Sequence, residues 1–255
     1  NNAINVYSTD TGALVTSLAG HRKPITDMKY SRHAPSTVYS SGEDRRVCTW
    51  DARAAASKAP VANFDCRGEA YCVSAGCGDT VIAVGVEAAV EFFDTRTRTR
   101  IGVYADNHTD EVTQVAFHPL DETQVVSGSE DGLVCVYDTK CSNADQALQG
   151  ILNTNCAIRR LGFFGAGYEG LFCISGSETL SLWHTKSFQC IRDWQNAREV
   201  IGGGAAPMMA EYLVDCHYEP EGDELYLLSG DWGGNVVLST VTDQVIQPVK
   251  RLSTA

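Results

Sequence analysis

The chain of 255 residues is acidic, with 32 Asp and Glu against 20 Lys and Arg and a formal net charge of −12. This balance disfavours direct binding to nucleic-acid phosphates, which requires clustered basic side chains. It favours basic protein partners through electrostatic steering, or it simply keeps the chain soluble. No apolar run approaches the length of a membrane-spanning helix, so we expect no membrane span.

The ten cysteines are scattered, and no two are spaced as C-x-x-C. Several lie among apolar residues, including Cys48, Cys135 and Cys173, and free cysteine there behaves as a small buried hydrophobe. Three others are close in sequence but have no histidine beside them, which argues against a zinc site: Cys66, Cys72 and Cys77. The sequence therefore predicts no metal site, no cofactor and a reducing compartment, either cytoplasmic or nuclear.

A set of five residues recurs in the same order 87 residues further along the chain. The first set is His21, Ser40, Asp44, Trp50 and Asp51, and the second is His108, Ser127, Asp131, Tyr137 and Asp138. Phe93-Asp94 stands between them, 43 residues after the first Trp-Asp pair and 44 before the Tyr-Asp pair. The chain is therefore a tandem array with a period of slightly more than 40 residues.

Within each unit, short runs rich in Val, Ile, Tyr, Phe and Thr are separated by Gly, Asp, Ser and Asn. This pattern predicts strands joined by tight turns, and no segment has a long helical period. In chain order, the expected strands include Ile25–Tyr30, Ser36–Ser40, Arg46–Trp50, Val112–Phe117, Thr123–Ser127 and Leu133–Tyr137. Glu43-Asp44 and Glu130-Asp131-Gly132 are expected as turns before third strands. A small four-stranded sheet cannot bury both faces alone, and stacking such sheets radially gives an all-β propeller.

The recurring residues resemble the motifs of the WD-repeat β-propeller family. The resemblance is carried by Gly20-His21, Ser40–Asp44 and Trp50-Asp51, and again by His108, Ser127–Gly132 and Tyr137-Asp138. It implies two buried hydrogen-bonded tetrads that tie strands together, His21–Ser40–Asp44–Trp50 and His108–Ser127–Asp131–Tyr137. A catalytic role for these His/Asp pairs is the alternative. However, a buried carboxylate must be paired, and an active site would not need copying in every second blade.

One subfamily of animal WD-repeat proteins is matched more closely, from about Tyr7 to the last strand. The similarity is specific around Thr109–Asp138 and is also carried by Trp50–Arg53, Arg198–Val200 and Tyr212-Leu213, whereas it is weak around Cys66–Gly85. That subfamily has no established enzymatic activity to carry over. The resemblance therefore informs the fold more than the function.

In chain order, we expect one domain over residues 1–255, with a partial blade at 1–20 and full blades at 21–65, 66–105, 106–152, 153–195 and 196–255. The last two depart from the motif, because His184 follows Trp183 and Ser239-Thr240 fills the final motif position. The chain opens in mid-blade with Asn1-Asn2 rather than Met. We therefore expect residues to be missing at both ends and the intact molecule to close with seven blades. A six-bladed or open propeller is the alternative.

Trp50–Arg53 has the form W-D-x-R, and Phe93–Arg96 repeats it with phenylalanine, so Arg53 and Arg96 would lie at equivalent points of consecutive blades. Such paired arginines resemble the contacts that WD-repeat substrate receptors of cullin-type ubiquitin ligases make with the damaged-DNA-binding adaptor protein. The guanidinium suits this role because it binds carboxylates in a bidentate manner. In the simpler alternative, each arginine pairs with the preceding Asp. Arg96, Arg98 and Arg100 alternate with threonines, which is typical of a solvated hairpin rim.

Motifs for a phosphate-binding loop, a nucleophile elbow and a zinc protease are absent from the sequence. Gly202-Gly203-Gly204 has no strand-then-helix context, so we expect the link Asn196–Met209 to be a flexible insertion loop. Met208 and Met209 would fill the core or provide adaptable partner contacts.

These features predict a non-catalytic scaffold that binds one or more proteins within a multiprotein assembly. The first alternative is a substrate receptor of a cullin-type ubiquitin ligase, which would bind the ligase adaptor. The second alternative belongs to another class and is a propeller enzyme with a site in its central channel.

Overall fold

The computed structural model describes residues 2–53, 59–202 and 210–253. The chain divides into two compact units, one made of residues 1–129 and 137–149 and the other of residues 130–136 and 150–255. Among the described residues, no helix is long and apolar enough to cross a membrane.

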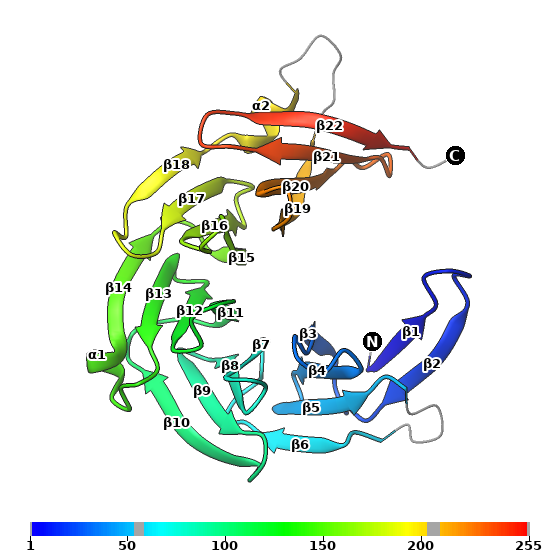
Figure 1. The fold of residues 1–255 in the computed structure, drawn as a ribbon, viewed down its shortest axis with the longest axis vertical. Helices are drawn as coiled ribbons and strands as arrows, with labels where there is room; N and C mark the ends of the chain where they lie inside the picture. Colours follow the sequence, from blue (N-terminus) through cyan, green and yellow to red (C-terminus); the bar gives the residue numbers. More distant parts are fainter. Residues whose placement is uncertain (1, 54–58, 203–209, 254–255) are drawn as a thin grey trace. The chain divides into compact units, whose positions relative to one another are not determined.

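Every sheet is built from strands that are consecutive in the chain, so the colour changes gradually within each sheet in Figure 1. A two-stranded antiparallel sheet comes first, from β1 (Ala3–Tyr7) and β2 (Leu14–Ala19). Four-stranded sheets follow. They consist of β3 (Ile25–Tyr30), β4 (Thr37–Gly42), β5 (Arg46–Asp51) and β6 (Ala62–Asp65); β7 (Cys72–Gly76), β8 (Val81–Val86), β9 (Ala89–Asp94) and β10 (Thr99–Ala105); β11 (Val112–Phe117), β12 (Gln124–Ser129), β13 (Leu133–Asp138) and β14 (Leu148–Asn153); β15 (Ile158–Phe164), β16 (Gly170–Ser175), β17 (Leu180–His184) and β18 (Cys190–Trp194); and β19 (Tyr212–Glu219), β20 (Glu224–Gly230), β21 (Val236–Val241) and β22 (Ile246–Leu252).

The repeated sheets confirm the all-β class predicted from the sequence. The six strands expected from the pattern are all present. Ile25–Tyr30 and Val112–Phe117 have the expected ends, and the ends of the other four differ from the expected ones by at most two residues. For example, the second strand of the first four-stranded sheet runs over Thr37–Gly42 rather than Ser36–Ser40. Hydrogen bonding beyond the apolar core extends these strands into the polar residues of the turns.

The turn before the third strand of each four-stranded sheet contains a residue with a left-handed backbone. These residues are Arg45, Ala88, Gly132, Glu178 and Gly234, with φ values of 63°, 53°, 80°, 61° and 82°. Glycine adopts this conformation readily, and other residues do so at a steric cost. The turn is therefore visible in the sequence at Gly132 but not at Ala88, where only the repeat register reveals it.

The first unit has cores between successive sheets. Trp50 is 1% exposed and packs in one cluster with Leu18, Val38 and Cys48, which joins the β1–β2 sheet to the next one. Phe64 and Phe93 meet edge to face at 5.7 Å between ring centroids and join the β3–β6 sheet to the β7–β10 sheet. Each sheet thus buries its apolar faces against its neighbours within this unit.

In the second unit, the strands β15–β18 and β19–β22 share a core that includes Leu180, Leu213 and Leu227. The helix α2 (Ala197–Gly202) joins this core through Ala197 and Ile201. The expectation of a flexible loop across Asn196–Met209 is therefore wrong for its first part, because these two small and branched apolar side chains anchor a helical turn in the core. Gly203, Gly204, Met208 and Met209 lie outside the described residues.

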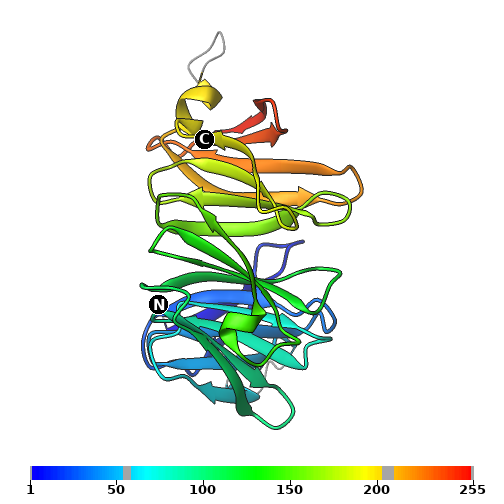
Figure 2. The same cartoon turned by 90° about the vertical axis from the view of Figure 1, so that its left-hand side faces the viewer.

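The other helix, α1 (Ala144–Ala147), connects β13 to β14 in a single turn. The side chain of Asn143 caps it by accepting the N–H groups of Asp145 and Gln146 at 2.9 and 3.3 Å. Both helices are short coils in Figure 2. They do not follow the strand pattern of the repeats, so the repeat register does not predict them.

We expect Gly85→Ala to lower the free energy of unfolding by about 1–3 kcal/mol, the usual range for overpacking a core. A methyl group at Gly85 would overlap the backbone oxygen of Val112 and the sulfur of Cys72, and a backbone atom cannot move aside as a side chain can. Gly68→Ala is the matched control, because its new methyl group would meet only Val86, at 4.0 Å. Urea unfolding followed by circular dichroism measures both changes. Equal midpoints for the two variants would contradict the close approach of β8 and β11.

Candidate functional site

Four side chains of the first four-stranded sheet form a continuous hydrogen-bonded set. The indole Nε1 of Trp50 donates to Ser40 Oγ at 2.8 Å, Ser40 Oγ lies 2.8 Å from His21 Nε2, and His21 Nδ1 lies 2.9 Å from Asp44 Oδ1. An indole N–H can only donate, so the serine hydroxyl accepts from it and donates its own proton to the imidazole. The remaining ring N–H then donates to the carboxylate.

This set joins segments that are distant in the sequence. His21 precedes β3, Ser40 is on β4, Asp44 is in the turn that follows, and Trp50 is on β5. Asp44 also accepts the backbone N–H of Arg22 at 2.7 Å. Burial by itself would raise the pKa of Asp44, but hydrogen bonds from Arg22 and His21 outweigh it and hold the pKa below its ordinary value.

The same set has the Ser–His–Asp order of a hydrolytic triad, but it is closed to substrate. Ser40 is 0% exposed, and so is the side chain of His21. A nucleophile must reach its substrate, and this hydroxyl is enclosed by the sheet that it fastens. The set therefore holds strands and turns together and is not arranged for a reaction. We call a buried hydrogen-bonded set of this kind a fastener.

The second predicted set contains the same buried histidine–serine contact. His108 Nε2 lies 2.7 Å from Ser127 Oγ, and both residues are buried. Asp131 is in the turn before β13 and accepts the N–H of Leu133 at 2.9 Å. Tyr137 is fully buried and its ring packs against Tyr104 at 4.9 Å between centroids.

The sheet between these two, β7–β10, carries no such set. The residues 43 positions after Ser40, Asp44 and Trp50 are Ala83, Glu87 and Phe93. In the loop before the first strand, Gly68 takes the place of the histidine. A different buried polar group serves this sheet. Glu91 on β9 is 0% exposed, and its carboxylate accepts Arg100 Nη1 at 3.2 Å and the backbone N–H of Arg67 at 3.4 Å.

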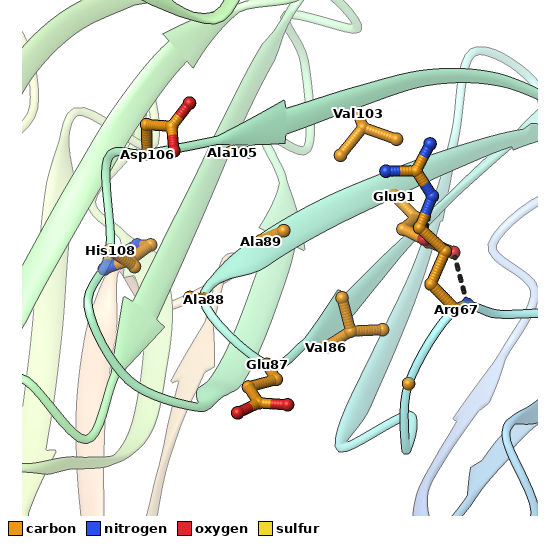
Figure 3. Close-up of a pocket in the computed structure, with 11 residues that line it drawn as sticks. Arg67, Val86, Glu87, Ala88, Ala89, Glu91, Val103, Ala105, Asp106 and His108 are labelled. Carbon is orange, nitrogen blue, oxygen red and sulfur yellow. Dashed lines mark hydrogen bonds and ion pairs between the residues drawn. The ribbon is translucent and has the colours of Figure 1, made fainter.

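A surface groove opens above Glu91, which we call the Glu91 groove (Figure 3). It measures about 330 Å³ and lies between the loop before β7, the β8–β9 turn and the end of β10. Its walls are small or apolar, including Gly68, Val86, Ala88, Ala89, Val103 and Ala105. Its charged lining residues are Arg67, Glu87, Glu91 and Asp106, so acidic groups predominate.

The preceding sheet has a groove at the equivalent place with the opposite balance of charge. It measures about 360 Å³, and its charged lining residues are Arg22, Asp44, Arg45, Arg46 and Asp65. The two alanines of the β8–β9 turn are thus arginines in the β4–β5 turn. Neighbouring sheets therefore present different charged side chains at the same structural position.

Arg53 and Arg96 lie just beyond the third strands of consecutive sheets and are highly exposed, with side chains 77% and 76% accessible. Each pairs with the Asp two residues before it: Arg53 with Asp51 at 3.1 Å and Arg96 with Asp94 at 3.3 Å. The hydrogen bond from Arg53 holds the pKa of Asp51 below its ordinary value. These contacts are those of the simpler alternative, in which each arginine pairs with the preceding Asp. A role of the two arginines in partner binding stays a prediction.

The Asp of this motif also shapes the turn after the strand. Asp51, Asp94 and Asp138 each accept the backbone N–H of the residue two positions later, at 3.0, 2.8 and 3.0 Å. In the degenerate fourth sheet, His184 Nδ1 accepts the N–H of Lys186 in the same way, at 3.2 Å. The imidazole nitrogen thus performs the acceptor role of the missing carboxylate.

Sequence reasoning missed Glu91. Its signal was a single carboxylate within the apolar run Ala89–Phe93, at the register position that holds the buried cysteines Cys48 and Cys135 in neighbouring sheets. It also treated Arg100 as part of a solvated rim with Arg96 and Arg98. All three are exposed, but the guanidinium of Arg100 reaches back to the buried carboxylate of Glu91.

The three cysteines that are close in sequence do not converge. Cys72 donates to the backbone oxygen of Val112 and Cys77 to that of Glu122, at 3.2 and 3.3 Å. Burial raises the pKa of the Cys66 and Cys72 thiols, which disfavours the thiolate form that binds metals. Within the described residues, no group of three or more His, Cys, Asp or Glu side chains could hold a metal ion.

We expect Asp44→Ala to lower the free energy of unfolding by about 1–3 kcal/mol, because it leaves the buried ring N–H of His21 and the backbone N–H of Arg22 without their acceptor. Asp10→Ala removes an exposed carboxylate and should cost less than about 0.5 kcal/mol. Urea unfolding measures both changes. If the two variants lost the same stability, the hydrogen-bonded set would not be a fastener.

Comparison with known proteins shows which family these repeats resemble. Residues 12–51 and 99–138 match the WD40 family, described as WD domain, G-beta repeat. The chain is 30% identical over 242 residues to the WD repeat-containing protein GTS1 of Arabidopsis thaliana, covering 92% of this chain and 61% of that protein. It is 29% identical over 248 residues to the WD repeat-containing protein 89 homolog of Dictyostelium discoideum, covering 97% of this chain and 67% of that protein. The chain thus spans about two thirds of the length of these curated relatives.

More distant similarities include a human protein and a chain of a solved assembly. The human DDB1- and CUL4-associated factor 5 is 26% identical over 141 residues, covering 53% of this chain and 14% of that protein. A chain in the crystal structure of a mitotic checkpoint complex superimposes with a TM-score of 0.77 at 16% identity, covering all of this chain and 72% of that one. The structural match supports the WD40 propeller fold alone.

Proposed function

We propose that this WD-repeat protein is a non-catalytic platform that holds other proteins in a larger assembly through the loops and grooves at the ends of its strands. Proteins with WD repeats are typically scaffolds for protein interactions. The platform would include residues 1–255 as one propeller domain with the blade boundaries given above. Its compartment would be the cytoplasm or the nucleus.

One observation carries this proposal. The Ser–His–Asp set at Ser40, which has the residue types of a catalytic triad, is sealed inside a sheet, while the charged loops around it are exposed. Buried hydrogen bonds of this kind stabilise a rigid body, and exposed loops on a rigid body provide binding surfaces. The acidic Glu91 groove is suited to basic side chains of a partner, in keeping with the net charge of −12.

Purification of the intact complex from cells tests the platform. We expect proteins to co-elute in stoichiometric amounts and to be depleted by Glu87→Lys with Asp106→Lys, because these changes reverse the charge of the Glu91 groove. Asp10→Lys with Glu221→Lys makes the same change in net charge at exposed positions elsewhere and should retain the partners. Elution of the protein alone, or with a small molecule at full occupancy, would overturn the platform.

A second candidate is the substrate receptor of a cullin-type ubiquitin ligase. Two observations favour it: the equivalent, highly exposed positions of Arg53 and Arg96, and the similarity to a human protein whose name links it to DDB1 and CUL4. Exposed ion pairs contribute little to stability, so a carboxylate of an adaptor could replace Asp51 or Asp94 as the partner of either arginine at small cost.

For this candidate, we expect Arg53→Ala with Arg96→Ala to remove the ligase adaptor from the purified complex, because both bidentate donors are lost. Arg98→Ala is the matched control, since Arg98 is exposed in the same hairpin but lies outside the W-D-x-R pattern. Adaptor recovery is measured by quantitative mass spectrometry. Undiminished adaptor in the double variant would reject the role of these arginines.

A further inference from the structure

Trp232 is the most exposed large apolar residue of the described chain. Its accessible fraction is 82%, whereas Trp50 and Trp194 are 1% and 5% exposed. It stands in the turn between β20 and β21, within Asp231–Asn235. An indole that faces water in this way buries little apolar surface for the fold, and tryptophan is enriched among residues that dominate binding interfaces.

The turn holds this indole in a defined place. The backbone N–H of Trp232 donates to Glu211 Oε2 at 2.6 Å, and the backbone N–H of Glu211 donates to the oxygen of Gly230 at 2.8 Å. The ring of Tyr212 lies 5.4 Å from the indole between centroids. Asp231 accepts the backbone and side-chain N–H groups of Asn235 at 2.9 and 2.7 Å. The exposed ring is therefore presented by an ordered turn.

The last part of the sequence, which contains Trp232, is acidic. Residues 210–255 contain eight Asp and Glu against two Lys and Arg, which is half of the net charge of the whole chain in its last 46 residues. Two of these carboxylates, Glu211 and Asp231, belong to the same turn contacts as the indole. Hydrogen bonds from Asn235 hold the pKa of Asp231 below its ordinary value. Two guanidinium groups also contact these residues: Arg251 Nη2 lies 3.7 Å from Asp231 Oδ2, and Arg198 Nη1 donates to the backbone oxygen of Glu211 at 3.0 Å.

The same unit contains a completed example of cation stacking. The guanidinium of Arg192 lies over the ring of Trp194, 5.5 Å from its centroid, and Trp194 is almost fully buried. In the described part of the chain, no cation lies over Trp232 in this manner. An aromatic face with adjacent carboxylates attracts a cation both through the ring quadrupole and through net charge.

We propose that Trp232 is the anchor for an arginine or lysine side chain from a basic segment of a partner protein. The cationic group would stack on the indole, and the carboxylates of Glu211 and Asp231 would supply the opposite charge. This inference rests on the proposed platform function and specifies the chemistry of one partner. It uses a surface that is separate in sequence from the Glu91 groove.

Acrylamide quenching of tryptophan fluorescence tests the contact directly. Trp50 and Trp194 are shielded and Trp183 is half-buried, so the quencher reports mainly on Trp232. A peptide of four alternating Arg-Gly pairs should protect this fluorescence at low salt, and the protection should fall as salt is added. A peptide of four Glu-Gly pairs should give no protection.

Variants separate the indole contact from general attraction to an acidic protein. With a dye-labelled Arg-Gly peptide followed by anisotropy, Trp232→Ala should weaken binding by about tenfold or more, although it leaves the net charge unchanged. Trp232→Phe should retain part of the affinity, because an aromatic face remains. Leu120→Ala removes another exposed apolar side chain, 68% accessible, and should have no effect.

Two variants that each remove one negative charge complete the test. Glu211→Gln should weaken the peptide severalfold, and Glu221→Gln, the same change at an exposed site on the β19–β20 turn, should not. Equal binding to the wild type and Trp232→Ala, or no binding to the wild type, would overturn the inference. If partners still co-elute from cells in that case, the platform stands and only this anchor fails; if none co-elutes, the platform fails independently of Trp232.

Discussion

The hydrogen-bonded set of Trp50, Ser40, His21 and Asp44 is the interaction on which the first repeat depends. It satisfies the buried indole N–H, serine hydroxyl and imidazole while tying the segment before β3 to β4, to the following turn and to β5. A sheet of four short strands has two apolar faces and few local contacts that fix its loops. Buried polar groups that find all their partners supply that missing specificity, because any misplaced strand would leave one of them unsatisfied.

The next sheet solves the same problem with other groups. Ala83 and Phe93 lack the hydroxyl and the indole N–H, and the buried carboxylate of Glu91 binds the loop before β7 and the outer strand β10 instead. The change has a consequence at the surface. Ala88 and Ala89 replace the two arginines of the preceding turn, so a groove with acidic character takes the place of one with more basic side chains. Repeats of one architecture thereby acquire different surface charge.

The candidate binding residues lie in turns and at strand ends because the strand interiors are buried. The strand interiors are occupied by the cores and by the fasteners, whereas Arg53, Arg96, the Glu91 groove and Trp232 lie where strands finish. Side chains in such places can vary without disturbing the core, because they make few buried contacts. A family of stacked sheets can therefore keep its fold while changing its partners.

The sequence by itself determined the repeat, the strand positions and the residues of the first fastener, because alternating apolar residues and motif spacing are local properties that survive in each copy. It did not determine which polar residue is buried or which apolar one is exposed. Glu91 is buried although glutamate is usually exposed, and Trp232 is exposed although tryptophan is usually buried. The helix α2 interrupts a link that was expected to be a loop. Those outcomes depend on which neighbour covers a side chain. Only the tertiary structure decides that, since the covering segments come from other sheets or from distant turns.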